Sequence, residues 1–140
     1  MSQENVEVVR RVIKEFQAGM ERGELGLLFD SEFVAADDFE WILVEPLDGR
    51  SVWVGPDEFI EFIHMWTEQF EDWSVQIEDV IDAGENGVVA LTSQSAIGRE
   101  SGVPVELKIG QVWEVEAGRA IRARNYLTHA EALEAAGLRG

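Results

Sequence analysis

The chain has 140 residues and no cysteine, a length typical of one domain, so disulfide frameworks and thiolate sites are excluded. Its formal net charge is −17, which repels phosphate backbones and anionic lipid headgroups and argues against nucleic-acid and membrane partners. Hydrophobic residues make up 46% of the chain, enough for a packed core. The start, "MSQENVEVVRRVIKEF", is too polar for a signal peptide, so we expect a cytoplasmic protein of one domain, residues 1–140.

The N-terminal segment is predicted to form an amphipathic helix. Apolar residues recur at steps of three and four from Val6 to Met20, which places them on one helix face. The following "GELGLLF" predicts a short second helix. Leu25, Leu28 and Phe29 are its inward residues.

A strand pair and a second long helix come next. "FEWILVEP" (39–46) is rich in β-branched and aromatic residues, and Asp48 and Gly49 predict a turn into a short return strand at 52–54. "GPDEFIEFIHMWTEQF" predicts a helix with proline and acidic residues in its first turn. Its predicted buried stripe is Phe59, Phe62, Ile63, Trp66 and Phe70.

The second half of the chain reads as a meander of strands. From Trp73 the apolar period changes from 3.6 to 2. Thr128 and Glu131 form a predicted capping box for a last helix. This order predicts an α+β fold, a strongly curved antiparallel sheet with helices on one face and a small-molecule pocket at the mouth of the resulting cone. The long strands are expected at 88–98, 103–115 and 120–127.

The segments "FEW", "WVGPDEFIEFIHMW" and "GQVWEVEAGRAIRARNYLTHAEALEAAGL" are similar to the SnoaL-like branch of the nuclear transport factor 2-like superfamily. The resemblance covers nearly the whole chain and implies a cone-shaped α+β barrel that pairs as a homodimer through its outer sheet faces. The superfamily includes isomerases, cyclases, epoxide hydrolases, dehydratases and non-catalytic binding modules. The fold therefore does not determine the function.

Three enzyme patterns of this superfamily require acidic residues, and most of the matching positions of this chain carry other residue types. The resemblance places the ketosteroid isomerase base at Trp41 (or the neighbouring Glu40), its tyrosine at Phe16 and its second acid at Gln111, which is also where the polyketide cyclases need an acid. A glutamine amide does not take up a proton near neutral pH. The Asp-Arg-Asp pattern of the epoxide hydrolases falls near Ser93 and Ser95, allowing a gap of one residue, and at Asn125.

Strand alternation predicts which side chains face the pocket. Gln111 and Trp113 share one strand face, and so do Ala123 and Asn125 on the next strand. The five tryptophans are interpreted either as pocket walls or as core. The predicted pocket residues are Trp41, Trp53, Phe62, Trp66, Gln111, Trp113 and Asn125, with Tyr126 nearer the rim.

The charged candidates allow two interpretations each. Glu45 shares parity with Trp41, so it is either a general base buried in the cavity or a rim carboxylate, and Glu40 has the opposite parity and serves as base only if a bulge turns it inward. Two histidines, His64 and His129, lie too far apart to form a local metal motif. The cations are read as counter-ions for an acidic ligand or as strand-surface ion pairs. They are Lys108, Arg122 and Arg124.

The leading hypothesis is the binding of a small, largely apolar molecule in the cone. Gln111 and Asn125 would supply uncharged hydrogen bonds, and the tryptophans would supply contact area. One alternative is an isomerase, cyclase or hydratase that uses Glu45 or Glu40. Another is an association module whose cone is filled by its own side chains. No metal or organic cofactor is expected.

Overall fold

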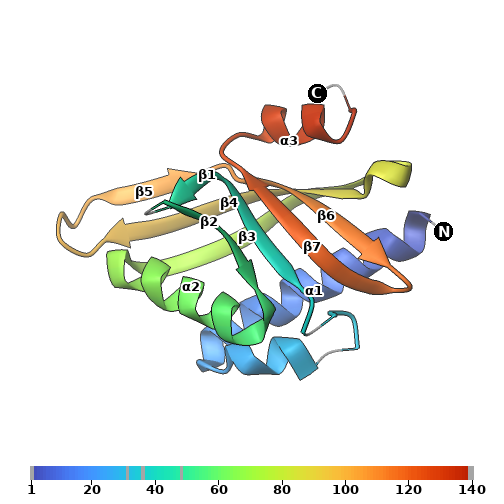
Figure 1. Ribbon diagram of the computed structural model, residues 1–140. Coiled ribbons are helices and arrows are strands. Elements are labelled where there is room, and N and C mark those ends of the chain that lie inside the picture. The colour runs from blue at the N-terminus through green and yellow to red at the C-terminus, as the bar shows by residue number, and fades with distance from the viewer. Residues whose placement is uncertain (1, 31, 36, 48, 139–140) are drawn as a thin grey trace.

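A curved sheet lies between two layers of helices in the computed structural model (Figure 1). The structure describes residues 2–30, 32–35, 37–47 and 49–138. Within them, seven strands form one sheet in the order β2-β1-β7-β6-β4-β3, with β5 paired to β4. The predicted α+β class is confirmed. The turn residue Asp48 lies outside the described residues.

The elements follow one another in the predicted order. The helical elements are α1 (Ser2–Arg22), η1 (Leu25–Asp30), α2 (Gly55–Gln69), η2 (Gly84–Asn86) and α3 (His129–Ala135). The strands are β1 (Glu40–Leu47), β2 (Arg50–Val54), β3 (Phe70–Asp82), β4 (Val88–Gly98), β5 (Pro104–Leu107), β6 (Gly110–Glu116) and β7 (Arg119–Tyr126).

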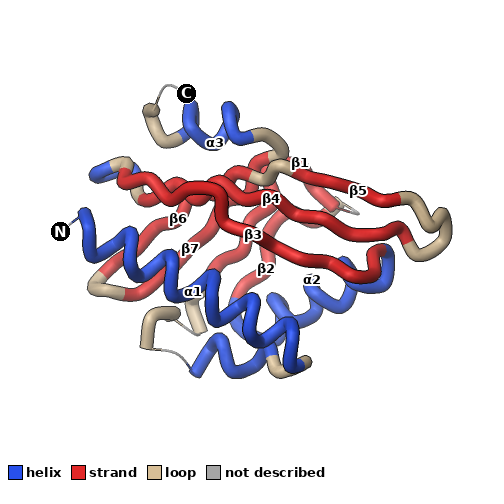
Figure 2. The backbone as a smooth tube through the Cα atoms, turned by 180° about the vertical axis from the view of Figure 1, so that it is seen from behind, coloured by secondary structure: helices blue, strands red, loops and turns tan. Residues whose placement is uncertain are grey.

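The apolar stripe of α1 faces the concave side of the sheet. Val6, Val9 and Ile13 are buried there. The helix ends at Arg22, and Gly23 follows it at a φ of +69°, a left-handed conformation that glycine adopts without a steric penalty. Figure 2 shows α1 and α2 on the same side of the sheet. In η1, Leu28 and Phe29 are buried as predicted, and the side chain of Leu25 lies outside the description.

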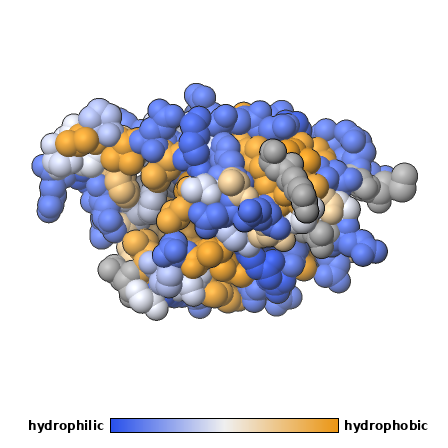
Figure 3. Space-filling view, turned by 90° about the horizontal axis from the view of Figure 1, so that it is seen from above, coloured by the Kyte–Doolittle hydropathy of each residue, from blue (hydrophilic) through white to orange (hydrophobic). Residues whose placement is uncertain are grey.

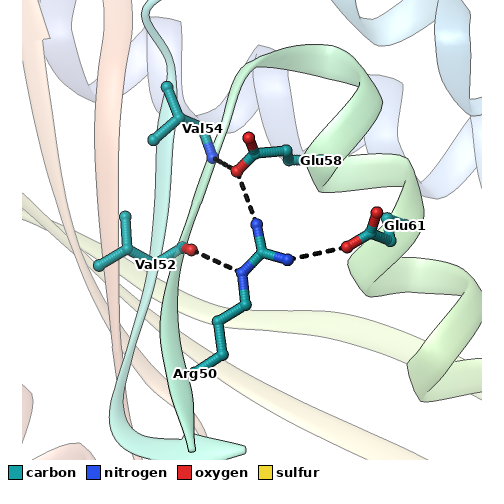
Figure 4. Close-up of polar contacts among 5 residues, drawn as sticks. All are labelled: Arg50, Val52, Val54, Glu58 and Glu61. Carbon is teal, nitrogen blue, oxygen red and sulfur yellow. Dashed lines mark hydrogen bonds and ion pairs between the residues drawn. The ribbon is translucent and has the colours of Figure 1, made fainter.

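A polar clamp holds the start of α2 against β2 (Figure 4). The side chain of the N-cap residue, Val54, makes no capping hydrogen bond. Instead Glu58 accepts the backbone N–H of Val54 at 2.9 Å, and Arg50 donates to Glu58 at 2.6 Å and to Glu61 at 2.8 Å. Arg50 also donates to the carbonyl of Val52 at 3.1 Å, so one guanidinium links strand and helix.

The sheet differs from the expected antiparallel meander at one pair of strands. β1 runs parallel to β7, with Trp41 opposite Ala123 and Leu43 opposite Asn125. These strands lie far apart in the sequence, so no hairpin turn sets their direction, and alternation alone does not reveal it. The predicted strand 103–115 is also divided. Between β5 and β6, the Ile109 carbonyl accepts both the backbone N–H and the hydroxyl of Thr92.

α3 packs on the opposite face of the sheet from α1 and α2, which corrects the prediction that all helices share one face. Its buried Ala132 and Ala136 contact Val89 and Val112. A Cβ placed on Gly110 would lie 2.5 Å from the Ala132 Cβ, so only glycine permits this close approach.

Thr128 caps α3 as predicted, but the second bond differs from that of a capping box, since the Glu131 carboxylate accepts from the Thr128 hydroxyl and not from its backbone N–H. Thr128 accepts the backbone N–H of Glu131 at 3.1 Å and donates to its carboxylate at the same distance. Viewed from the α3 side, apolar patches alternate with hydrophilic side chains (Figure 3). None of the described helices is long and apolar enough to span a membrane.

Candidate functional site: an aromatic cavity with uncharged polar groups

A cavity with about 70 Å³ of free space lies between α1, α2 and the concave face of the sheet. An engineered apolar cavity of roughly 150 Å³ is known to bind benzene. The free space here is less than half of that, so a ring-sized guest requires lining side chains to move. The lining residues that are only half-buried, and thus have room to move, are Phe16, Leu43, Trp66, Trp73 and Val75.

Eight of the eighteen described residues that line the cavity are aromatic. Trp41 packs edge-on against Phe59 with ring centroids 5.1 Å apart, and it lies 6.4 Å from Trp113. Trp66 stacks on Phe62 at 6.1 Å and lies 5.8 Å from Trp73. Edge-to-face and offset arrangements of this kind add stability beyond the area that the rings bury. The wall is buried at Trp41 and half-buried at Trp66.

A surface groove borders the cavity between α1 and β3. It shares Phe16, Trp73 and Val75 with the cavity and has about 370 Å³ of space. Phe16 and Trp73 meet edge-on at 5.7 Å. These two half-buried rings therefore lie between the groove and the cavity.

A chain of hydrogen bonds crosses the cavity wall from β6 to β1. Trp113 Nε1 donates to Gln111 Oε1 at 3.0 Å, and Gln111 Nε2 donates to Asn125 Oδ1 at 2.9 Å. Asn125 Nδ2 then donates to the carbonyl of Ile42 at 3.0 Å. Both amide side chains are buried, and their hydrogen bonds compensate the cost of removing them from water.

A second chain runs along the other side of the cavity. Trp73 Nε1 donates to Gln94 Oε1 at 3.1 Å, and Gln94 Nε2 donates to Thr92 Oγ1 at 3.3 Å. The Thr92 hydroxyl donates to the carbonyl of Ile109 at 2.8 Å. None of the described residues that line the cavity has an ionisable side chain. The cavity is therefore polar at a few points without being charged.

Two buried indole N–H groups in this cavity have no hydrogen-bond partner among the described residues. They belong to Trp41, which is 8% exposed, and to Trp66. Buried donors of this kind are rare in folded proteins, because leaving one unpaired costs about 1–3 kcal/mol. The pair is therefore a candidate contact for a ligand.

Six of the eight predicted pocket residues line the cavity, and two do not. Trp53 is 1% exposed and packs against Phe62 at 4.9 Å, with the Arg50 guanidinium over its ring, so it supports the wall from behind. Tyr126 packs beside α3 on the opposite face of the sheet. The six that line the cavity are Trp41, Phe62, Trp66, Gln111, Trp113 and Asn125.

Neither candidate carboxylate lines the cavity. Glu45 is exposed in the second half of β1. Glu40 accepts from Arg122 at 2.5 Å, and Glu114 accepts from both Arg122 and Arg124. The hydrogen bond to Glu40 raises the pKa of Arg122 above its ordinary value, and the nearby Glu114 adds to this. A catalytic role for Glu45 or Glu40 stays a prediction, and neither side chain reaches the cavity as it stands.

Sequence reasoning missed Gln94 and Trp73 as cavity residues. The epoxide hydrolase pattern pointed near Ser93 and Ser95, and the residue between them, Gln94, faces inward. Ser95 is exposed and shares a hydrogen bond with Ser74. The apolar alternation that marks an inward strand face is weak in β4, because its inward residues are two polar residues and a small one. They are Thr92, Gln94 and Ala96.

The remaining candidates lie outside the cavity. His64 is exposed on α2, and His129 Nε2 lies 2.9 Å from the carbonyl of Thr92. Lys108 donates to Glu78 at 2.7 Å, and this bond raises the pKa of Lys108 and lowers that of Glu78. Lys108, Arg122 and Arg124 thus form strand-surface ion pairs, the second of their two predicted interpretations. In the described parts of the chain, no cluster of His, Asp and Glu is suited to a metal ion.

Comparison with known proteins confirms the resemblance seen in the sequence. The family described as "SnoaL-like domain" matches residues 10–123. None of the curated proteins matches the chain. The matched range contains most of the cavity lining and leaves out Asn125 and α3.

Solved structures share the fold along nearly the whole chain. A nuclear transport factor 2-like protein of unknown function from Burkholderia pseudomallei K96243 is 25% identical with a TM-score of 0.69, over 96% of this chain and 97% of that one. A provisionally assigned SnoaL-like polyketide cyclase from Jannaschia sp. CCS1 is 19% identical with a TM-score of 0.71, over 90% and 86%. TerC, co-crystallised with polyporic acid, is 17% identical with a TM-score of 0.70, over 96% and 98%.

Proposed function

The chain belongs to the SnoaL-like domain family, and we propose that it uses the cavity of this fold to bind a small, largely apolar organic molecule. The observation that carries the proposal is the pair of unpartnered indole N–H groups of Trp41 and Trp66 in a cavity lined by uncharged side chains. Apolar walls with a few polar groups that orient the guest are typical of small-molecule sites. TerC, which has the same fold, was co-crystallised with an organic molecule, but likeness of fold does not transfer its ligand.

Binding is better supported than proton transfer. The polar side chains that line the cavity are amides and indoles, which neither gain nor lose a proton near neutral pH. An enzyme that uses Glu45 or Glu40 would need one of these carboxylates to enter the cavity, and the ion pair of Glu40 with Arg122 holds it outside. An isomerase, cyclase or hydratase reaction is therefore the less favoured proposal.

The small free space favours a second candidate, an association module whose cone is filled by its own side chains. About 70 Å³ is enough for a few water molecules but not for an aromatic ring. The two candidates differ in one respect. A binding site opens at its half-buried rim when a guest arrives, whereas a filled cone does not.

Ligand titration of a matched pair of variants tests the proposal. Leu43 lines the rim and Val44, its neighbour on β1, is exposed. We expect neutral ring compounds to raise the melting temperature of the wild type and of Val44→Trp, and to have no effect on Leu43→Trp, whose new indole blocks the cavity. A ligand at roughly 100 times its Kd raises the unfolding free energy by about 2.7 kcal/mol.

Thermal shifts and ligand-detected NMR give independent readouts of this titration. If no ring compound in a broad panel shifts the wild-type melting temperature or shows transfer to the protein, the filled-cone module replaces the binding proposal. If both variants respond like the wild type, the guest binds elsewhere on the protein.

The homodimer implied by the resemblance also remains a proposal. Each chain carries a formal charge of −17, so pairing brings like charges together. We expect association to strengthen with ionic strength, because salt screens this repulsion. Sedimentation at low and high salt measures it, and a single-chain mass under both conditions would contradict it.

A further inference from the structure

The hydrogen-bond chain that starts at Trp113 has a fixed direction. An indole N–H only donates, so the Gln111 atom that faces Trp113 is the amide oxygen. The Gln111 amino group must then face the oxygen of Asn125. The Asn125 amino group in turn faces the carbonyl of Ile42, which only accepts. Donor-only and acceptor-only groups at the two ends thus fix the orientation of both amides.

The chain that starts at Trp73 has the same direction. Its donor-only indole faces the oxygen of Gln94, and it ends on the carbonyl of Ile109 by way of Thr92. The oxygens of all three cavity amides, those of Gln94, Gln111 and Asn125, therefore already accept a hydrogen bond. Each amide donates one of its two amino hydrogens within the described residues and accepts on one of the two lone pairs of its oxygen, so the amides keep both donor and acceptor capacity.

The cavity groups that have no hydrogen-bond partner at all among the described residues are donors. They are the indole N–H groups of Trp41 and Trp66. Trp41 is nine-tenths buried, so bulk water does not satisfy it. The two rings belong to the same aromatic wall, since Phe62 packs against Trp41 at 5.9 Å and against Trp66 at 6.1 Å.

We propose that the ligand is an uncharged molecule with a hydrogen-bond acceptor oxygen, of the ketone, ester or ether class, and that Trp41 and Trp66 donate to it. This inference rests on the proposed binding function and names its ligand class. A carboxylate would lose its hydration without gaining a counter-ion, because the described lining holds no ionisable side chain and the protein is strongly acidic. An ammonium group would face the two indole donors and find no carboxylate in the described lining to balance its charge.

Three probes that share a benzene ring test the ligand class: acetophenone (a neutral acceptor), ethylbenzene (no polar group) and benzoate (a charged acceptor). We expect acetophenone to bind about tenfold more tightly than ethylbenzene, the effect of one or two net hydrogen bonds. Benzoate should bind more weakly than acetophenone. Titration of ¹⁵N-labelled protein, followed on the indole N–H signals of its five tryptophans, gives the affinities.

The same spectra show which indoles donate to the probe. Acetophenone should move the signals of Trp41 and Trp66 downfield, the direction expected for a new hydrogen bond. Trp41→Phe and Trp66→Phe keep a ring but lose the N–H, so each should reduce the preference for acetophenone over ethylbenzene. Trp53→Phe is the control, because Trp53 supports the wall without lining the cavity, and it should keep the preference.

The outcomes separate this inference from the proposed function. Equal binding of acetophenone and ethylbenzene, without downfield shifts of the two indoles, would overturn the acceptor class and leave the binding function standing. Tighter binding of benzoate would overturn the requirement for an uncharged ligand. If none of the three probes binds, the binding function fails and the ligand class fails with it.

Discussion

The two faces of the hairpin formed by β6 and β7 carry different kinds of cross-strand side-chain pair. On the concave face, Gln111 lies opposite Asn125, and the two amides share a hydrogen bond. On the outer face, Glu114 lies opposite Arg122, and the two form an ion pair. Water reaches the outer pair but not the inner one, and burying a charge costs far more than burying an amide. Burial therefore decides which residue types each face carries.

Placing a charge on the inner face should have the largest effect on stability. Gln111→Glu buries a carboxylate opposite the Asn125 oxygen, and we expect the unfolding free energy to fall by about 3–5 kcal/mol at neutral pH. Burial raises the pKa of the new carboxyl above its unfolded value. Stability should thus be lost as the pH rises through the ordinary glutamate range and recover as the pH falls.

Glu114→Gln, the opposite change on the outer face, is the matched control. We expect it to lower the unfolding free energy by about 1 kcal/mol or less, because its ion pairs are partly solvated. Denaturant unfolding across a range of pH measures both variants. A Gln111→Glu protein as stable as the wild type at neutral pH would show that the inner face is open to water.

Cutting one of the inner hydrogen-bond chains should have the second largest effect. Gln94→Leu introduces an apolar side chain of similar size and leaves the Trp73 N–H without its acceptor. We expect a loss of about 1–3 kcal/mol, the cost of a buried donor without a partner. Ser95→Ala, at the exposed neighbouring position, should change the unfolding free energy by less than about 0.5 kcal/mol. Equal losses in the two variants would contradict the assigned role of Gln94.

Removing the central cation of the outer network should have a smaller effect that depends on salt. Arg122→Met leaves Glu40 and Glu114 without their shared partner, and we expect a loss of about 1 kcal/mol at low ionic strength. The loss should shrink with added salt, since salt screens partly exposed pairs. Arg99→Met, which breaks a more exposed pair with Glu71, is the control and should change stability less. A loss that is independent of salt would point to packing by the arginine stem.

The exposed pair of Glu78 and Lys108 should give the smallest effect, visible in its pH dependence. Its hydrogen bond lowers the pKa of Glu78 from the ordinary 4.5, so the pair contributes stability above that pH and loses it as the pH falls through the lowered pKa. Glu78→Gln should therefore melt slightly below the wild type at neutral pH and match it in acid. The same difference at both values would show that ionisation of Glu78 is not involved.

The sequence predicted the elements well because their signals are local. The apolar spacing of α1, the proline and acidic residues that open α2, and the Thr128 cap of α3 each depend on neighbours a few residues apart. Strand alternation likewise placed Gln111, Trp113 and Asn125 on the inner face. Predictions failed where the outcome depends on distant strands, as in the parallel pairing of β1 with β7 and the division of 103–115 into two strands.

In the candidate site, too, local features were predictable from the sequence and features that depend on distant contacts were not. Composition and alternation determined an uncharged inner face with aromatic walls, because side-chain parity follows from the strand backbone itself. Only the tertiary structure decided that Gln94 faces inward and that Trp53 lies behind the wall. It alone paired Glu40 with Arg122 and left the N–H groups of Trp41 and Trp66 without partners. These features depend on contacts between segments up to 82 residues apart, and no local pattern encodes such contacts.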